Sequence, residues 1–395
     1  MRSFSSLALS LLFVFFSATS RDGRFATSEN AFADEDWGFF AHQKINRLAV
    51  FTLPGPLGGY FKKKIDYLGE HATDPDKRRY AVPGEAKKHY IDLDRYGSFP
   101  FEHLPRHYED AQLAFLEISL LLPSGDTLPL VTPGTWESEL GLMWFVQGPL
   151  AKQKRPWSKK DFTSLLKEYF ISRKGELKAP SCRKLKKILQ LPDTLPCDKV
   201  LLRSFLDEHG ILPYHLVRAY WSLVRAFELG DEKRILKQAA DLGHYIADAH
   251  VPLHTTENYD GQLTGQEGIH AFWESRLPEL FSDRYDFFVG PAEYIEQPAD
   301  FFWQTVFESH SMVDSVLEIE RQLRAEYPQQ QRYGYEERGG VNLRTSSRTY
   351  ALAYHQALNG MVERRMRAAI RAVGSIWYTA FLDAKKKRKT LPFPP

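Results

Sequence analysis

Cysteine is scarce in this chain of 395 residues, which contains only Cys182 and Cys197. Two thiols argue against a zinc-thiolate site. In an oxidising compartment the pair can form one disulfide that closes a short loop, whereas in a reducing compartment both remain free thiols. The sequence leaves these two alternatives open.

The sequence also lacks a strong charge of one sign, a linker and a zinc-peptidase motif. Its formal net charge of +2 implies neither nucleic acid nor membrane as a partner. No Ser/Gly-rich or low-complexity tract divides the chain, so we expect one large domain with insertions. The motif H-E-x-x-H does not occur, which disfavours a zinc peptidase. Apolar residues make up 43% of the chain, which is enough for a buried core.

No apolar run is long enough for a membrane anchor. The longest run near the start, Leu7 to Ala18, has about a dozen residues, whereas a membrane-spanning helix needs roughly 20. Arg2 precedes this run and small residues follow it, which is the pattern of a secretory signal peptide. We therefore predict a leader over residues 1–33, cleaved near Ala33, and a protein exported to the periplasm or secreted, with no transmembrane segment in the mature chain.

Most of the remaining chain has apolar residues at three- and four-residue intervals, the period of amphipathic helices. No segment predicts a large sheet. We expect an all-α, single multi-helix domain over residues 37–384, with a basic insertion at 156–199 and a basic tail at 385–395. The predicted helices are Phe39 to Phe51, Tyr108 to Leu121, Pro213 to Leu229, Glu232 to His250, Ile269 to Leu277, Ala299 to Tyr327 and Thr349 to Leu382.

Five potential metal ligands occur in one short stretch with the pattern H-x3-D-x5-H-x15-H-x3-E. They are His244, Asp248, His254, His270 and Glu274. Residues four apart lie on the same face of a helix, so the first two can chelate one ion and the last two another. Imidazole and carboxylate both suit zinc. One such pair arises readily by chance, but two pairs flanking a further histidine indicate more than one zinc ion.

Two segments further upstream carry additional candidates. Trp37 and His42 open the first predicted helix as W-x4-H, and His89 begins the sequence H-Y-I-D. An acid-rich turn with Asp74 and Asp76 lies between them. Taken singly, such a histidine is more often structural, and such an aspartate more often forms a solvated ion pair.

In this order the motifs resemble the superfamily of bacterial zinc-dependent phospholipases C and single-strand-specific zinc nucleases. The segments HYIADAHVPLH, from His244 to His254, and GIHAFWE, from Gly268 to Glu274, carry the resemblance. Glu274 as the closing acid and the short gap between His254 and His270 are similar to the phospholipase branch. The W-x4-H spacing of Trp37 and His42 is similar to the nuclease branch.

The resemblance implies a cluster of two or three zinc ions between facing helices. The first ion would be held by His89, His244, Asp248 and an upstream aspartate. This aspartate is Asp74 or Asp76, and the D-x-x-R-Y context favours Asp76. The second ion would be held by His254, His270 and Glu274. The third would be held by Trp37, His42 and the shared Asp248, which requires Trp37 as the mature N-terminus, whereas the leader predicts cleavage upstream of it.

The same resemblance implies an exported, phospholipase C-like hydrolase of phosphate esters. Clustered zinc ions would activate a water molecule as hydroxide for in-line attack at phosphorus, and the upstream aspartate, Asp76 or Asp74, would orient this nucleophile or accept the proton of the water. Arg78 or Arg79 is a candidate for contact with the phosphate. The expected partner is a phospholipid or another phosphodiester. The alternatives are a single-strand-specific nuclease of the same superfamily and a zinc-binding protein without catalysis.

Overall fold

A computed structural model describes residues 31–102, 104–132, 145–146, 168, 170–171, 177–189, 191–338 and 340–387. The predicted leader up to residue 30, much of the predicted insertion at 156–199 and the end of the basic tail after residue 387 lie outside the described residues.

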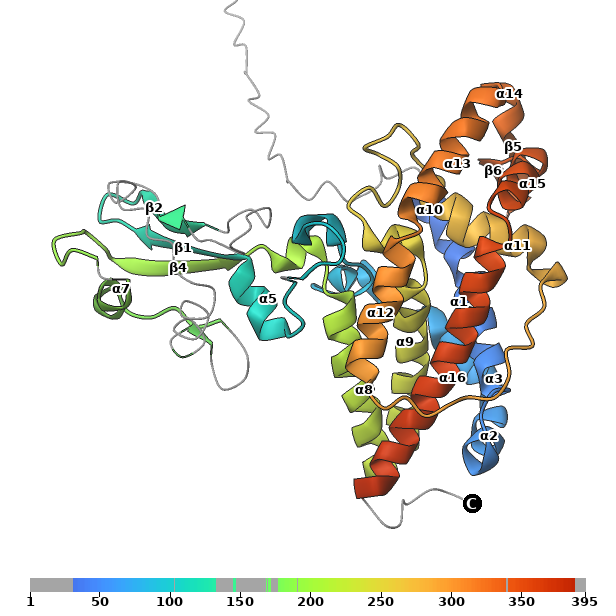
Figure 1. The fold of residues 1–395 in the computed structure, drawn as a ribbon, viewed down its shortest axis with the longest axis horizontal. Coiled ribbons are helices and arrows are strands. Elements are labelled where there is room, and N and C mark those ends of the chain that lie inside the picture. The colour runs from blue at the N-terminus through green and yellow to red at the C-terminus, as the bar shows by residue number, and fades with distance from the viewer. Residues whose placement is uncertain are drawn as a thin grey trace, which may run out of the picture.

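The described chain is mostly helical (Figure 1). The α-helices are α1 (Ala31–Val50), α2 (Gly55–Lys62), α3 (Ile65–Glu70), α4 (Asp74–Arg79), α5 (Tyr108–Ala114), α7 (Cys182–Ile188), α8 (Leu212–Leu229), α9 (Glu232–Ala249), α10 (Ile269–Ala271), α11 (Leu277–Phe281), α12 (Pro298–His310), α13 (Val313–Glu326), α14 (Gln329–Arg332), α15 (Arg348–Ala357) and α16 (Met361–Lys387). Short 3-10 turns include η1 (His71–Thr73), η2 (Ala86–Lys88), η3 (Leu93–Tyr96), η5 (Leu206–His209), η6 (Pro252–Thr255) and η8 (Ser282–Arg284), and η7 (Phe272–Arg276) is a π-helix.

Two small sheets correct the expectation of an all-α chain. The first has four strands in the order β3-β2-β1-β4, namely β1 (Leu116–Leu121), β2 (Thr127–Thr132), β3 (Phe145–Val146) and β4 (Lys199–Ser204). The second is a hairpin of β5 (Tyr333–Arg338) and β6 (Val341–Ser346). The predicted helix from Tyr108 to Leu121 was half wrong, because α5 ends at Ala114 and the chain continues as β1. The segment LEISLL there is rich in branched apolar residues and finds its partners in β2 and β4.

Three other predicted helices are interrupted. The segment from Ile269 to Leu277 is divided into α10, the π-helix η7 and the first residue of α11. The segment from Ala299 to Tyr327 forms α12 and α13, and the segment from Thr349 to Leu382 lies in α15 and α16. Between α15 and α16, Asn359 and Gly360 have φ angles of 47° and 73°. These left-handed conformations end a helix without steric cost only at glycine and a few polar residues. The helices predicted around Phe39–Phe51, Pro213–Leu229 and Glu232–His250 are confirmed as α1, α8 and α9.

The helical body packs around α9, whose residues from Ala239 to Ala249 are all buried. The long helix α16 runs beside α8 and α9, and the indole Nε1–H of Trp377 donates to the carbonyl oxygen of Ala239 at 3.0 Å. Asp231 caps the start of α9 by accepting a hydrogen bond from the backbone N–H of Arg234. Burial on all sides fixes the rotation of α9 and therefore the direction of its polar side chains.

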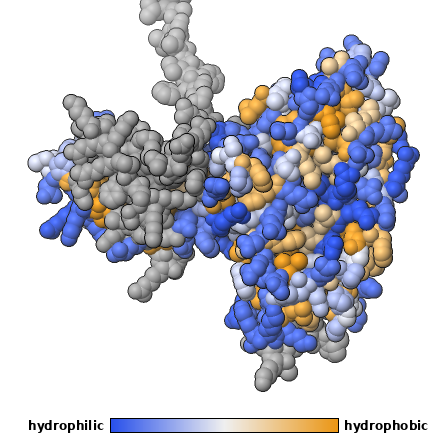
Figure 2. Space-filling view, in the orientation of Figure 1, coloured by the Kyte–Doolittle hydropathy of each residue, from blue (hydrophilic) through white to orange (hydrophobic). Residues whose placement is uncertain are grey.

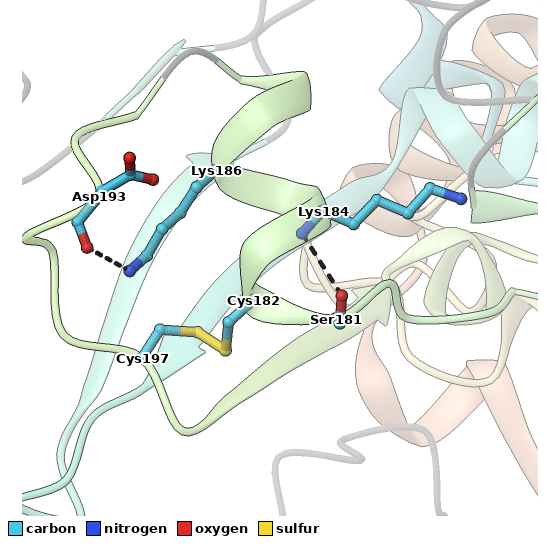
Figure 3. The surroundings of a disulfide bond; sticks show 6 residues. All are labelled: Ser181, Cys182, Lys184, Lys186, Asp193 and Cys197. Carbon is cyan, nitrogen blue, oxygen red and sulfur yellow. Dashed lines mark hydrogen bonds between the residues drawn. A yellow bond between two sulfur atoms is a disulfide. The ribbon is translucent and has the colours of Figure 1, made fainter.

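A separate lobe projects from this body and contains the four-stranded sheet and α7 (Figure 1). A disulfide joins Cys182 at the start of α7 to Cys197, just before β4 (Figure 3). The structure therefore decides between the two alternatives for the cysteines. Ser181 caps α7 by accepting a hydrogen bond from the backbone N–H of Lys184.

None of the helices in the described part of the chain combines the length and the apolar character needed to cross a membrane.

Candidate metal centre

The centre is built on α9, from which His244 and Asp248 project on the same face. Both side chains are almost completely buried, with exposures of 0% for His244 and 1% for Asp248. Their four-residue spacing brings the Nε2 of His244 to 3.2 Å from an oxygen of Asp248. The spacing in the sequence thus becomes one chelating pair.

Close packing of α1 against α9 brings His42 into the centre, beside His244. A Cβ on Gly243 would lie 2.0 Å from the side-chain oxygen of Asn46, so only glycine fits at this contact. The Nδ2 of Asn46 donates to the carbonyl oxygens of Leu68 and Ala240, at 3.1 Å each, and so joins α1 to α3 and α9. One turn earlier on α1, the ring of His42 stacks on the ring of His244 with centroids 4.0 Å apart.

The first ligand group contains Asp76, His89 and His244. The Nδ1 of His89 lies 3.0 Å from the Nε2 of His244, and Asp76 has an oxygen within 3.6 Å and 3.7 Å of these two nitrogens. The Nδ1–H of His244 donates to the carbonyl oxygen of Ala72 at 2.8 Å, since a carbonyl can only accept. This hydrogen bond leaves the Nε2 of His244 with its lone pair directed into the group.

The second ligand group contains His254, His270 and Glu274. The Nε2 atoms of the two histidines lie 3.2 Å and 2.8 Å from the same oxygen of Glu274. Their Nδ1–H groups donate to the carbonyl oxygens of His89 and Tyr259, at 2.5 Å and 3.3 Å. In neutral rings with this tautomer, both Nε2 atoms and the carboxylate oxygen are acceptors that face one another. Such a group needs a cation, either a metal ion or an additional proton.

Asp248 connects the two sides of the centre. One of its oxygens lies 3.0 Å from the Nδ1 of His89, and the other lies 3.5 Å from the Nε2 of His42. The same nitrogen of His42 lies 3.2 Å from Glu274. Asp248 thus contacts His89 of the first group directly and reaches the second group through His42, which lies between Asp248 and Glu274.

Three sets of side chains can therefore hold a metal ion, each with ligand atoms within 4.8 Å of one another. They are Asp76, His89 and His244; His254, His270 and Glu274; and His42, His244 and Asp248. The donor set fits a metal, because buried nitrogen and carboxylate acceptors converge where a protein without an ion would have to add protons. The Nδ1 of His42 and the Nε2 of His89, which are buried, have no hydrogen-bond partner among the described residues.

The charges at the centre shift the pKa of its acids in different directions. Burial raises the pKa of Asp248 to about 7, and the negative charges of Asp76 and Glu274 act in the same direction. Burial acts on Asp76 too, but the nearby His244 and Arg79 outweigh it and lower its pKa. The histidines around Glu274, His254 first, likewise hold its pKa well below the usual range against burial.

The pKa values of two of the histidines also shift in opposite directions. Burial, together with the charges of His244 and Arg79, keeps the pKa of His89 well below its usual value. Burial also acts on His270, but Glu274 reverses it and raises the pKa. A metal ion at the second group would take the place of the proton that Glu274 favours on His270.

The structure distinguishes the two upstream aspartates. Asp76 faces the first group, whereas Asp74 lies outside it, with an oxygen 2.7 Å from the Nδ1 of His71 on the surface. Both belong to α4, but residues two apart in a helix point in different directions. The geometry favours Asp76 as the upstream ligand.

The two arginines of α4 also differ. Arg78 lies 3.1 Å from Asp241 and 3.2 Å from the buried Glu85, so it joins α4 to α9. Arg79 is exposed, and its charge acts on Asp76, Asp248 and His270. It forms no ion pair within 4.0 Å with any residue that the structure describes, and its Nη2 donates a hydrogen bond to the hydroxyl of Tyr80 at 3.3 Å. Arg79 therefore lies at the edge of the centre without a carboxylate of the described residues bound to its guanidinium.

Trp37 lies inside α1, whose helical backbone begins at Ala31. In the full chain its nitrogen is thus part of a peptide bond. The side chain of Trp37 lies outside the described residues. The third set of ligands brought together here contains His42 and Asp248, as predicted, with His244 in addition.

Sequence reasoning missed the residues that position the ligands. Gly243 is a glycine inside a helical pattern, and such a glycine could have predicted that another segment packs closely against α9 at this position. The roles of Asn46 and of the Ala72 carbonyl had no local signal, because they depend on contacts between distant segments. The π-helix η7, which carries Glu274, was also missed, although π-helical turns occur frequently at functional sites.

The chain matches none of the protein-family models and none of the curated proteins with which it was compared.

Proposed function

We propose that this protein is an exported zinc-dependent hydrolase of phosphate esters, of the phospholipase C-like type. The observation that carries the proposal is the second group, where His254, His270 and Glu274 direct acceptors at one another. Neutral imidazole and carboxylate are ligands that zinc prefers. The mostly helical fold, with ligands on facing helices, agrees with the resemblance to zinc-dependent phospholipases C and zinc nucleases.

The number of ions follows from the ligand sets. The first and second groups each provide three protein ligands, which is the number found in catalytic zinc sites. The third set shares His244 with the first group and has His42 and Asp248 as its own ligands. We therefore propose two ions, with a third where another ligand completes the set.

Bound zinc would supply Lewis acidity, which lowers the pKa of water and stabilises negative charge on phosphate oxygens. The chain's own groups would then position the reactants. Asp248 lies between His89 of the first group and His42, which in turn contacts Glu274 of the second group, so it would help to hold the two groups at a fixed separation. Asp76 is partly accessible, with 18% of its side chain exposed, and its lowered pKa keeps it ionised at neutral pH. An ionised carboxylate at this position can orient an attacking water and accept its proton.

Arg79 would bind a nonbridging phosphate oxygen. It is exposed at the edge of the centre, its charge acts on Asp76 and Asp248, and a guanidinium offers two parallel donors to a phosphate. Arg78, in contrast, is occupied by Glu85 and Asp241. We propose that Arg79 contacts the substrate and that Arg78 only supports α4.

One observation favours the nuclease alternative. The ring of Tyr80 is 50% exposed, and the guanidinium of Arg79 lies 5.4 Å from its centre. An aromatic ring beside a phosphate-binding arginine can stack a nucleobase, and stacking contributes about 1–3 kcal/mol per base. For a zinc-binding protein without catalysis we would expect closed coordination, whereas Asp76 and His270 are both partly accessible.

Export is supported by the disulfide between Cys182 and Cys197, because such bonds persist in oxidising compartments. The predicted signal peptide lies outside the described residues, so the sequence pattern is its support. Sequencing the N-terminus of the secreted protein would show whether the leader is removed. It would also show whether cleavage occurs after Ala33 or immediately before Trp37.

The deciding experiment compares three substrates. Purified, zinc-loaded protein is assayed in parallel on phosphatidylcholine, single-stranded DNA and a generic phosphodiester, beside the His254→Ala variant. Preferred release of a phosphorylated head group supports the phospholipase C-like function, and preferred cleavage of DNA supports the nuclease. If none of the three substrates is hydrolysed faster than by the variant, the catalytic proposal is overturned. Elemental analysis of the same samples gives the number of zinc ions.

A further inference from the structure

The projecting lobe carries an excess of positive charge in its second half. Residues 177–204 contain seven basic and two acidic side chains. Four of the basic residues belong to the short helix α7, which has the sequence CRKLKKI. The lobe stands apart from the helical body, and its outer edge, where Figure 1 places α7, is hydrophilic in Figure 2.

The cations of α7 are concentrated on its solvent-facing side. Arg183, Lys184 and Lys187 are exposed, and their spacings of three and four residues put them on one face of the helix. The opposite side packs into the lobe through Leu185 and Leu189, which are buried. We call the three exposed cations the α7 cationic face.

One feature keeps this face in place, and another leaves two of its cations, Arg183 and Lys187, without an ion pair among the described residues. The disulfide between Cys182 and Cys197 ties the first residue of α7 to the segment that enters β4 (Figure 3). Arg183 and Lys187 form no ion pair within 4.0 Å with a carboxylate in the part of the chain that the structure describes. The neighbouring Lys186 turns away from this face and donates to the carbonyl oxygen of Asp193 at 2.8 Å.

We propose that the α7 cationic face binds the anionic head groups of a lipid membrane. Clustered lysine and arginine side chains are attracted to the negative surface of such a membrane, and each contributes about fivefold in affinity. The described part of the lobe has no exposed aromatic residue that could stack nucleobases, which single-strand binding normally requires. Within the described residues, the face offers contacts to phosphate without a stacking platform, which suits an anionic lipid surface better than single-stranded nucleic acid.

The α7 cationic face can bind a membrane whether or not the protein hydrolyses phosphate esters. Arg183, Lys184 and Lys187 belong to the lobe and are not among the metal-ligand sets of the helical body. If the protein also has the proposed phospholipase C-like activity, the α7 cationic face would hold it at the surface where its substrate is found. Failure of one proposal leaves the other intact.

The test measures flotation of the full-length protein with vesicles. One set of vesicles is phosphatidylcholine alone, and the other contains phosphatidylcholine with about a third of phosphatidylserine. The triple variant R183S/K184S/K187S is compared with the control K63S/K233S/R348S, which removes the same charge from exposed positions of the helical body. Lipid phosphorus is measured in every sample so that hydrolysis is seen separately from binding.

We expect the wild type to bind only the anionic vesicles, and to bind them less as salt increases. The α7 variant should bind at least about tenfold more weakly, while the control binds like the wild type and all three proteins keep the same thermal midpoint. Equal binding by the α7 variant and the wild type, an equal loss in the control, or absence of wild-type binding to anionic vesicles would each overturn the proposal. So would a variant that loses binding to a single-stranded oligonucleotide but keeps binding to the vesicles.

Discussion

His254 and His89, which are 165 positions apart in the chain, support each other at the candidate metal centre. The Nδ1–H of His254 donates to the carbonyl oxygen of His89 at 2.5 Å, and the backbone N–H of Ile91 donates back to the carbonyl oxygen of His254 at 2.9 Å. A ligand of the second group is therefore oriented by the backbone of a ligand of the first. We expect the two groups to bind metal as a coupled unit.

This coupling makes His254→Ala a sensitive variant. We expect it to lose the ion of the second group and to reduce phosphodiester hydrolysis by more than about 100-fold, because both a ligand and its orienting hydrogen bond disappear. Zinc is counted by elemental analysis, and hydrolysis is measured at saturating zinc. His107→Ala is the matched control, since His107 is exposed and lies outside the three ligand sets. Full zinc content in His254→Ala would contradict the assignment of the second group.

Replacing each aspartate of α4 by asparagine should affect zinc binding and activity at Asp76 but not at Asp74. Asp76→Asn should weaken zinc binding at the first group and reduce activity by about 100-fold or more, because a carboxylate ligand becomes a neutral amide. Asp74→Asn should keep both zinc and activity and lower stability by less than about 1 kcal/mol, since it removes only surface pairs with His71 and Lys77. The reverse result would assign the ligand to Asp74.

The two arginines of α4 form a similar pair. Arg79→Gln should lower kcat/KM by about 100-fold, the effect of removing one donor to a reacting phosphate, with little change in stability. Arg78→Gln should lower the free energy of unfolding by about 2 kcal/mol, because it removes the guanidinium that joins Glu85 to Asp241, although Tyr245 and Lys237 still contact these acids. Steady-state kinetics and urea unfolding on both variants separate the roles. A stability loss in Arg79→Gln as large as in Arg78→Gln would contradict this division.

His215 should make the protein sensitive to acid. Burial, with the charge of Lys88, lowers its pKa from 6.5 to about 3. The unfolded chain binds a proton at this residue below about pH 6.5, while the folded protein does so only near pH 3, so stability falls as the pH falls between these values. After allowance for partial exposure, the loss at pH 4.5 is about 2 kcal/mol. Urea unfolding at pH 7 and pH 4.5 measures it, and His215→Asn should lose less than the wild type. An equal loss in both proteins would show that other groups dominate.

Reduction of the disulfide should affect the lobe and not the metal centre. The bond closes a loop with a sequence separation of 15 residues, for which chain entropy predicts about 3 kcal/mol. The variant C182S/C197S should therefore exchange amide hydrogens faster in α7 and β4, with zinc content and hydrolysis unchanged. Hydrogen exchange followed by mass spectrometry resolves the two regions. A loss of zinc in this variant would mean that the lobe supports the centre.

Several features of the fold and the candidate site were predictable from the sequence. The four-residue spacings of His244 with Asp248 and of His270 with Glu274 encode chelating pairs, because one helical turn places such residues side by side. The apolar periodicity that predicted α1, α8 and α9 likewise depends on residues three and four positions apart. The scarcity of cysteine restricted its role to one disulfide or two thiols. All of these depend on residues within a few turns of one another.

Contacts between segments far apart in the chain could be identified only from the tertiary structure. Only packing shows that Asp76 faces the cluster and Asp74 does not, and that Arg79 is available while Arg78 is paired. The segment from Leu116 to Leu121 has a pattern that fits a helix or a strand, and its pairing with β2 and β4 made it a strand. The contact between Gly243 and Asn46, which brings His42 to His244, joins two helices far apart in the chain. Sequence periodicity specifies which face of a helix is buried, whereas the partner of that face is decided by close packing of the whole core.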